Sequence, residues 1–289
     1  LVIMADQLGL SVGDLFMGAV FPGLMLGGMY ITYILIYSYV KPNVAPVPKD
    51  AKAVTWPVVA NVLKAVLPTL LLIFVVLGSI FGGFATPTEA SGVGALGATL
   101  LAIYNRRFSI PVLREVMGGT LNTTAYIFAI FIGATCFALV LRELGGDELI
   151  ESFLTGLPFG PYGIIFFILG VIFLLGFFLD WIEITLIILP LLAPVISALG
   201  LDINGYGVVD NPELVWFVML VAMALQTSFL TPPVGFALFY LKGVCPPNVK
   251  LKDIYKGVLP FIGLQLIALF ILVFWPQIVL WLPAIAYAK

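Results

Sequence analysis

The sequence predicts an all-α polytopic membrane protein, and three observations carry this prediction. Hydrophobic residues make up 62% of the chain and charged residues only 10%, whereas soluble domains average about 45–50% apolar and about 25% charged residues. Uncharged runs alternate with short polar loops, and about 20 apolar residues suffice to cross a bilayer. Two of these runs carry prolines or acidic residues near their middle. We therefore expect several spanning helices, some of them broken at membrane depth.

Composition also excludes several classes of protein. The net charge of −2 and the isoelectric point near 5.1 argue against nucleic-acid binding. The chain has no histidine, which excludes histidine-ligated metal sites and histidine general bases. Cys136 and Cys245 show neither a zinc spacing nor a disulfide framework. We expect neither an enzyme nor an organic cofactor.

The chain starts within an apolar segment. Leu1 is not an initiator methionine, and no signal peptide is recognisable. We expect a C-terminal portion of a longer protein. The first predicted spans are Leu15–Val40, bent by Pro22, and Ala65–Thr88, with the polar connector Lys41–Lys64 between them.

A helix-start signal follows the second span. Thr86 is placed to cap a helix that begins at Pro87 and runs to about Tyr104. Glu89 falls in its first turn, where negative charge is favoured, and Thr88 lies between them. The simple interpretation is a helix start, and the sharper one is a place in a polar pathway through the membrane.

The segment from Val116 to Leu141 is uncharged but contains glycine, asparagine and threonine residues. A Gly145-Gly146 pair then separates it from a short helix expected to end near Gly156. Two interpretations are open: a re-entrant hairpin, or a span followed by an interfacial helix.

Two acidic residues interrupt the next apolar stretch. Asp180 and Glu183 are flanked by apolar sequence on both sides. A charged residue at the centre of a membrane helix costs about 2.5–3.5 kcal/mol on insertion scales, so each needs a partner or a cavity. A helix break after Leu179 accounts for both, since Asp180 would then cap the second half-helix and Glu183 would lie in its first turn. The alternative is a loop between two full spans.

A second break is predicted in the uncharged run Leu214–Leu241. Its centre reads Q-T-S-F-L-T-P-P-V-G from Gln226 to Gly235. Proline has no N–H and clashes with the preceding turn, so the helix should end near Thr231. Carbonyls and hydroxyls freed at this depth suit a small cation, and the alternative is a kink without a ligand. The residues concerned are Thr227, Thr231, Pro232, Pro233 and Gly235.

The two ends of the chain repeat one pattern. Val12–Leu24 and Leu251–Leu264 each place an aspartate, a glycine and a proline in matched order at the start of a span. An acidic loop precedes the first copy and a basic loop precedes the second, which predicts an inverted repeat of the kind found in ion-driven transporters. The basic loops Lys41–Lys64, Arg106–Arg114 and Lys242–Lys256 should be cytoplasmic.

Four separated motifs together resemble the large membrane subunit of tripartite ATP-independent periplasmic (TRAP) transporters. They are G-G-F-A-T-P-T-E-A (Gly82–Ala90), G-F-F-L-D (Gly176–Asp180) with I-I-L-P-L-L-A-P-V (Ile187–Val195), L-T-P-P-V-G (Leu230–Gly235) and G-V-L-P-F (Gly257–Phe261). The sequence departs from the family pattern at Trp181, where proline or methionine is frequent, and at Glu183.

The resemblance implies an elevator-type secondary transporter of the bacterial inner membrane that is driven by sodium. It also implies two partners, a small membrane subunit and a periplasmic substrate-binding protein, and an organic acid such as a dicarboxylate as substrate. The second repeat's transport region would occupy residues 116–241, after scaffold helices in 1–115 and before a basic loop and last span in 242–289. The implied cation or substrate site combines a hairpin tip at Gly133–Thr135 with Gly176, Asp180 and the Thr227–Gly235 break.

Two other classes of function remain open. One is an ion-coupled anion carrier that works without a binding protein. The other is an intramembrane enzyme, for which only Asp180 and Glu183 with Thr185 offer a base and a nucleophile.

Overall fold

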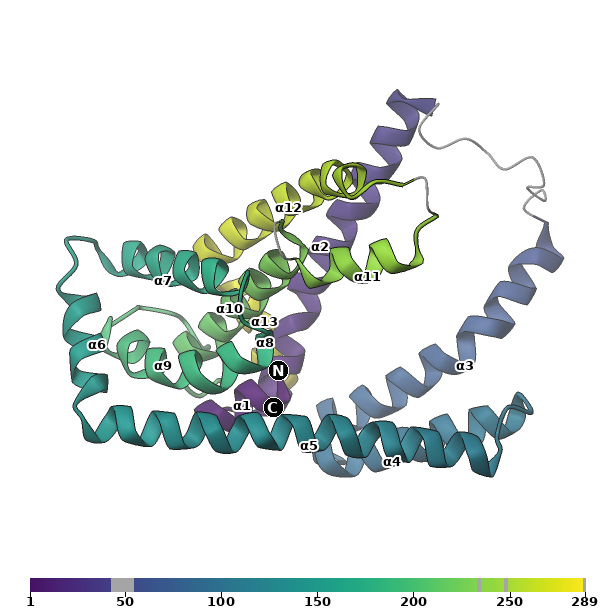
Figure 1. Ribbon diagram of the computed structural model, residues 1–289, viewed down its shortest axis with the longest axis horizontal. Helices are drawn as coiled ribbons and strands as arrows, with labels where there is room; N and C mark the ends of the chain where they lie inside the picture. The colour runs from purple at the N-terminus through teal and green to yellow at the C-terminus, as the bar shows by residue number, and fades with distance from the viewer. Residues whose placement is uncertain (43–54, 233–234, 247–248, 288–289) are drawn as a thin grey trace. The chain divides into compact units, whose positions relative to one another are not determined.

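The computed structural model describes residues 1–42, 55–232, 235–246 and 249–287, and the regular elements of these residues are all helical (Figure 1). The elements are α1 (Val2–Leu8), α2 (Val12–Val40), α3 (Trp56–Phe81), α4 (Pro87–Tyr104), α5 (Ile110–Glu143), α6 (Gly146–Thr155), α7 (Pro161–Leu175), α8 (Trp181–Glu183), the π-helical segment η2 (Ile184–Ile188), α9 (Leu189–Ala198), α10 (Pro212–Leu230), α11 (Phe236–Val244), α12 (Leu251–Phe274) and α13 (Gln277–Tyr287).

Six helical stretches in the described residues are long and apolar enough to cross a membrane. They are α2, α3, α5, the continuous stretch Trp181–Ala198, α10 and α12. The shorter helices α7 and α13 are apolar as well. The prediction of an all-α polytopic membrane protein is therefore confirmed.

The chain divides into two compact units. The first contains residues 1–32 and 126–289, and the second contains residues 33–125. The helices α2 and α5 each contribute to both units. This division follows packing alone, so the functional division expected at residues 115 and 241 stays a prediction.

Helix α10 forms the centre of the first unit. It packs against α7, α9, α12 and α13 (Figure 1), and 72% of its spanning window is buried. Trp216, which is fully buried, donates its indole N–H to the carbonyl oxygen of Leu272 on α12 over 2.7 Å. An indole N–H left unpaired inside an apolar core would destabilise the folded protein, so this hydrogen bond helps to fix α10 against α12.

Aromatic rings join α7 to the same two helices. Tyr162 on α7 lies edge-on to Trp216 and stacks on Phe274 of α12. Phe166, one helical turn later, contacts Phe270 and Phe274. These rings fix the first half of α7, and its packing on α10 places its C-terminal end beside that helix.

In the second unit, α3 and α4 pack against each other at two glycines of α4. A Cβ atom on Gly97 would overlap Leu72 of α3, and one on Gly94 would lie 3.4 Å from Val76. Small residues let membrane helices approach closely in this way. The two helices expose many large apolar side chains, among them Phe74, at 74% exposure.

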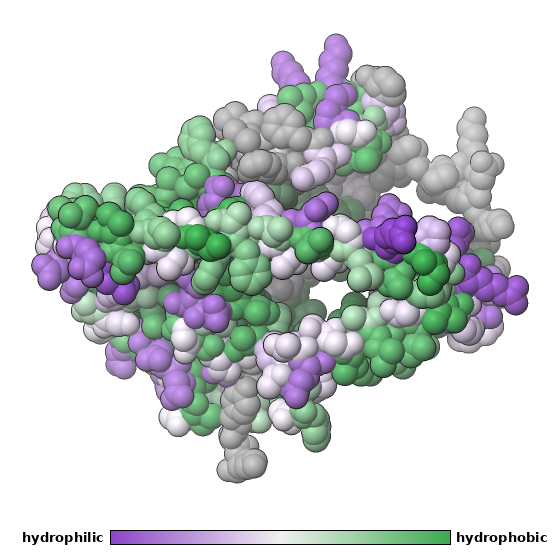
Figure 2. All heavy atoms as spheres, turned by 60° about the horizontal axis from the view of Figure 1, so that its bottom comes forward, coloured by the Kyte–Doolittle hydropathy of each residue, from purple (hydrophilic) through white to green (hydrophobic). Residues whose placement is uncertain are grey.

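Hydrophobic areas also dominate much of the face drawn in Figure 2, between scattered hydrophilic clusters. A soluble monomer rarely exposes apolar patches of more than a few hundred square ångströms. An apolar exterior of this kind is what a lipid environment requires.

The last apolar run differs from the single last span expected within residues 242–289. It contains two helices, because α12 ends at Phe274 and α13 begins at Gln277. Trp275 between them leaves the helical region, with φ −127° and ψ 73°. The physical reason is Pro276, which disfavours α-helical geometry in the residue before it.

Both copies of the repeated pattern begin a long helix. Asp14 lies in the first turn of α2 and Asp253 in the first turn of α12. The two copies therefore occupy matched positions in their helices. The inverted relation between them stays a prediction.

The Gly145-Gly146 pair forms the turn between α5 and α6. Gly145 has φ +76°, a conformation that glycine adopts without strain. Arg142, just before the turn, pairs with Asp147 just after it over 3.0 Å. A long and a short helix thus meet at this turn, which both interpretations of the segment allow.

Candidate functional site

The first predicted helix break is present at Asp180. Helix α7 ends at Leu175, and Asp180 is the N-cap of the next helix, with extended backbone geometry. Its carboxylate accepts a hydrogen bond from the Trp181 backbone N–H at 2.8 Å. The Glu183 carboxylate accepts one from the Asp180 N–H at 3.1 Å, which completes a capping box. Asp180 and Glu183 therefore serve the helix start, as predicted.

The helix that follows this break is wider than an α-helix for one turn. In η2 the N–H of Leu189 donates to the carbonyl of Ile184, five residues back. The Thr185 carbonyl would normally accept from the N–H of Leu189 in an α-helix or of residue 190 in a π-helix. The Leu189 N–H is bonded to Ile184 and Pro190 has no N–H, so the Thr185 carbonyl loses both regular helical donors. The Thr185 hydroxyl is fully buried and has no hydrogen-bond partner among the described residues. Such π-helical turns often occur at functional sites.

The second predicted break is present at Thr231. Helix α10 ends at Leu230, and Thr231 is extended, with φ −92° and ψ 131°. Its hydroxyl donates to the carbonyl of Thr227 at 2.7 Å, and its N–H donates to the carbonyl of Ser228 at 3.0 Å. A hydroxyl that donates its proton into the helix keeps its oxygen lone pairs available to a ligand.

The chain resumes as a helix at Phe236. Gly235, just before it, has φ +33°, a region that disfavours side chains. A Cβ at this position would lie 2.9 Å from the carbonyl oxygen of Thr231, so the two sides of the break approach closely. Pro232 lies on this turn, and Pro233 lies outside the described residues.

The two breaks meet at Gly176. This glycine follows the end of α7, and a Cβ atom on it would overlap the Ser228 side chain of α10, 2.7 Å from its Cβ. Ser228 is buried and donates its hydroxyl to Leu225, while its neighbour Thr227 is buried and donates to Met223. Gly176 therefore lets the turn before Asp180 lie directly on the hydroxyl-rich end of α10.

The expected hairpin tip at Gly133–Thr135 is not a turn in this structure. Both Gly133 and Thr135 lie inside the continuous helix α5, whose turn to α6 comes later, at Gly145. The physical reason is that glycine and threonine lower helix propensity by only about 1 kcal/mol or less each, so without a proline they do not end a long helix. The Thr135 hydroxyl donates to the carbonyl of Phe131 and is exposed.

The middle of α5 nevertheless contacts the Asp180 break. Ala134 is buried in a small cluster with Ile182 and Leu186, which belong to α8 and η2. Gly133 and Thr135 thus flank a residue that packs on the first turns after Asp180. Their role in binding stays a prediction.

Thr86 and Glu89 form a complete capping box at the start of α4, in the second unit. The Glu89 carboxylate accepts hydrogen bonds from the backbone N–H and the hydroxyl of Thr86, both at 2.8 Å. These bonds hold the pKa of Glu89 below its ordinary value. The helix-start interpretation is confirmed, and a pathway role for Thr86, Thr88 or Glu89 stays a prediction.

The polar groups around the two breaks offer oxygen atoms as metal ligands. Hydroxyls and carbonyls of Thr227, Ser228 and Thr231 lie on one side, and Gly176 and the Asp180 cap lie on the other. Hard cations prefer such ligands, whereas transition metals favour nitrogen and sulfur. No group of three or more histidine, cysteine, aspartate or glutamate residues gathers within the described chain. This donor set fits sodium.

A cleft of about 370 Å³ lies beside the two breaks and was not anticipated from the sequence. It is lined by Leu1, Met4, Trp181, Ala222, Leu225, Gln226 and Phe229. Its lining residues come from three segments that are far apart in the chain, so no local pattern indicates it. The unusual tryptophan after the aspartate motif was the only signal in the sequence.

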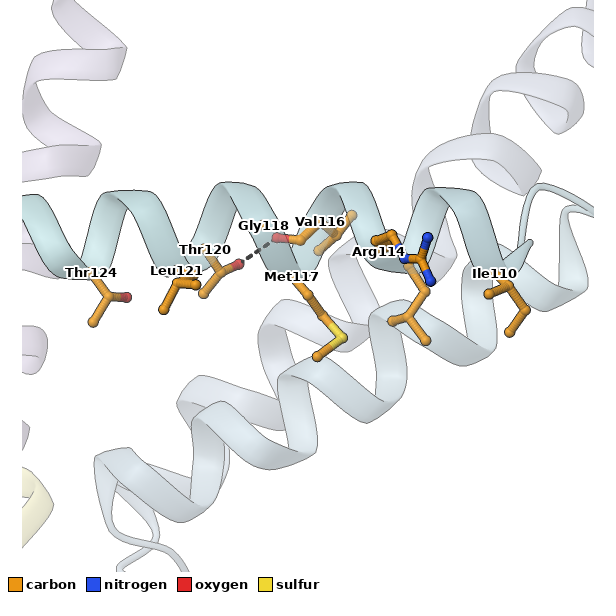
Figure 3. A pocket seen from close by; sticks show the side chains of 9 residues that line it. Ile110, Arg114, Val116, Met117, Gly118, Thr120, Leu121 and Thr124 are labelled. Atoms are coloured by element: carbon orange, nitrogen blue, oxygen red, sulfur yellow. Dashed lines mark hydrogen bonds between the residues drawn. The ribbon is translucent and has the colours of Figure 1, made fainter.

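A different hollow, of about 790 Å³, lies along α5 (Figure 3). All of its lining residues come from this one helix, between Ile110 and Thr124, and Arg114 is the only charged residue among them. The Thr120 hydroxyl donates to the carbonyl of Val116 within the same helix. A one-sided, apolar helix face of this kind lacks the converging polar groups of a ligand site.

Comparisons with known proteins agree with the four sequence motifs at Gly82–Ala90, Gly176–Val195, Leu230–Gly235 and Gly257–Phe261. The model of the family described as the DctM component of the tripartite ATP-independent periplasmic transporter matches residues 1–278. The chain is 30% identical, over 98% of its length, to the sialic acid TRAP transporter large permease protein of Vibrio cholerae. It is 28% identical over 99% to the C4-dicarboxylate permease of the same organism, and 29% identical over 96% to the ectoine permease of Halomonas elongata.

The chain is shorter than these relatives. It spans 62%, 64% and 61% of their lengths, respectively.

Proposed function

Because this chain belongs to the DctM family of tripartite ATP-independent periplasmic transporters, multi-pass permeases of the inner membrane, we propose that the full-length protein is a sodium-coupled importer of organic acid anions. The observation that carries this proposal is the contact of Gly176 with Ser228, which joins two helix breaks in one oxygen-rich place. Broken helices near the midplane are where secondary transporters bind their ions and substrates.

Sodium binding would organise the two breaks for the substrate. Oxygens of Thr231 and Thr227 belong to one break, and Gly176 belongs to the turn that lies against it. A cation held by both would favour the arrangement in which they touch. If that arrangement also binds the anion better, each ligand raises the affinity of the other by the same factor.

The proposed partners are a small membrane subunit and a periplasmic substrate-binding protein. The related permeases are named for sialic acid, C4-dicarboxylates and ectoine, so organic acids are the class that this chain would move. We further propose an elevator-type motion, in which the unit that contains both breaks carries the ligands across.

The test is uptake into proteoliposomes that hold the full-length permease and its small membrane subunit. A candidate binding protein, sought among the neighbouring genes, is first screened against organic acids, and the acid that most raises its melting temperature is then used radiolabelled. We expect uptake only with the loaded binding protein and an inward sodium gradient. Uptake without the binding protein would favour a carrier that works alone, and uptake that is indifferent to sodium would contradict the proposal.

A further inference from the structure

The cleft beside the two breaks, here called the Trp181 cleft, has a largely apolar lining. Its seven lining residues are Leu1, Met4, Trp181, Ala222, Leu225, Gln226 and Phe229. None of their side chains is charged, and all but that of Gln226 present mainly carbon or sulfur surface. A volume of about 370 Å³ falls within the range of small-molecule pockets, about 300–1,000 Å³.

Two polar groups in this cleft are available to a ligand. The Trp181 side chain is 42% exposed, and Gln226 is exposed on α10. Within the described residues neither the indole N–H of Trp181 nor the amide of Gln226 makes a hydrogen bond. A few polar groups in an apolar pocket fix the orientation of a small molecule.

The position of the cleft ties it to the candidate site. Trp181 directly follows the capping residue Asp180, and its backbone N–H is held by that carboxylate. Gln226 directly precedes Thr227, whose hydroxyl and carbonyl belong to the second break. The carbonyl of Leu225, which lines the cleft, accepts the hydroxyl of Ser228, so the cleft lies within one helical turn of the contact between the two breaks.

We propose that the Trp181 cleft holds the apolar body of the transported acid, and that this body is an aromatic ring with a hydrogen-bonding substituent. The indole offers an extended face for stacking, which favours a planar ring over a flexible chain. The indole N–H and the Gln226 amide would bind a substituent that accepts a hydrogen bond. A four-carbon dicarboxylate has no ring to stack on the indole and would leave the cleft unfilled. This inference rests on the proposed transport of organic acids.

The test is equilibrium binding to the purified full-length permease with its small subunit, at saturating sodium. The probes are 4-hydroxyphenylacetate, phenylacetate and succinate. We expect 4-hydroxyphenylacetate to bind at least tenfold more tightly than succinate. Trp181→Met, which keeps an apolar side chain suited to a helix, should weaken binding of both aromatic acids about two- to tenfold and leave succinate unchanged, because it removes the ring face on which an aromatic acid stacks.

Two further variants separate the parts of the inference. Gln226→Leu should lower the preference for 4-hydroxyphenylacetate over phenylacetate, since it removes the hydrogen-bonding group and keeps the apolar lining. Trp281→Met is the matched control, because Trp281 is 44% exposed and lies on α13, outside the cleft. It should leave all three affinities unchanged.

Equal affinity for succinate and the aromatic acids, or unchanged aromatic binding in Trp181→Met, would overturn the inference. The occupant of the cleft would then be a lipid acyl chain. The failure of the proposed function would look different. In that case no organic acid would be taken up with sodium, whatever the ring preference in binding.

Discussion

The two helix breaks of the first unit interrupt apolar helices in chemically different ways. At Asp180 the exposed helix end is closed by the chain's own carboxylates, which accept from Trp181 and from Asp180 itself. At Thr231 the break contains no charged side chain, and hydroxyls donate back into the helix that has just ended. One break thus satisfies its donors internally, while the other presents oxygen acceptors.

The difference assigns a different task to each break. A capping box stabilises a helix start without any ligand, so the Asp180 break should persist in the ligand-free protein. The Thr231 break has no capping carboxylate, and its hydroxyl oxygens keep lone pairs for a ligand, so the geometry of this break should depend more on a bound ligand. The contact of Gly176 with Ser228 connects the two.

The largest expected effect comes from separating the two breaks. Gly176→Ala places a Cβ on the Ser228 side chain, so one of the two segments must move. We expect sodium-dependent uptake to fall more than tenfold in the reconstituted complex. Gly170→Ala on α7 meets nothing within 4 Å and should leave uptake near normal. Partial recovery in the double variant Gly176→Ala/Ser228→Gly would show that the contact itself is responsible, and equal loss in both single glycine variants would argue against it.

A smaller effect is expected from removing the cap. Asp180→Ala deletes the acceptor for the Trp181 N–H, and N-cap losses cost about 0.5–2 kcal/mol. We expect a lower melting temperature and a several-fold lower uptake rate. Asp180→Asn can still cap and should retain more of both. Asp202→Ala, outside the helices, is the control and should be near neutral; equal tolerance of Asp180→Ala and Asp202→Ala would count against a structural break at Asp180.

The smallest effect is expected at Thr185. Its hydroxyl is fully buried without a partner in the described chain, whereas the equally buried Thr227 hydroxyl donates to Met223. Thr185→Val removes an unsatisfied polar group and should stabilise the protein by about 1 kcal/mol. Thr227→Val removes a made hydrogen bond and should not stabilise it. Thermal unfolding in detergent compares the two, and a destabilised Thr185→Val would mean that this hydroxyl has a bound partner in the full-length protein.

Local signals in the sequence predicted both breaks. Asp180 and Glu183 between apolar runs, and prolines after Thr231, each have a direct physical consequence for a helix. Long-range packing could not be predicted in the same way, because nothing near Gly176 indicates Ser228 as its neighbour. Pro190 likewise gives no indication of the π-helical turn that it accompanies, since a missing donor can be accommodated in more than one way.

The misplaced element shows the limit of resemblance. The resemblance to the family implied a hairpin tip at Gly133–Thr135. The chain carries no proline at that place, and α5 continues through it to Glu143. The turn comes instead at Gly145, where a positive φ requires glycine.

The central claim is that oxygens of the Thr231 break bind the coupling cation, and Thr231→Val tests it most directly. This change keeps the shape of the side chain and removes its oxygen, so it should weaken sodium binding without altering direct contacts to the anion. The measurement is the initial uptake rate against sodium concentration in proteoliposomes with the small subunit and the loaded binding protein. We predict a several-fold higher sodium requirement, with the maximal rate recovered at high sodium. An unchanged sodium curve with a lower maximal rate would mean that Thr231 serves only the helix break, and would contradict the claim.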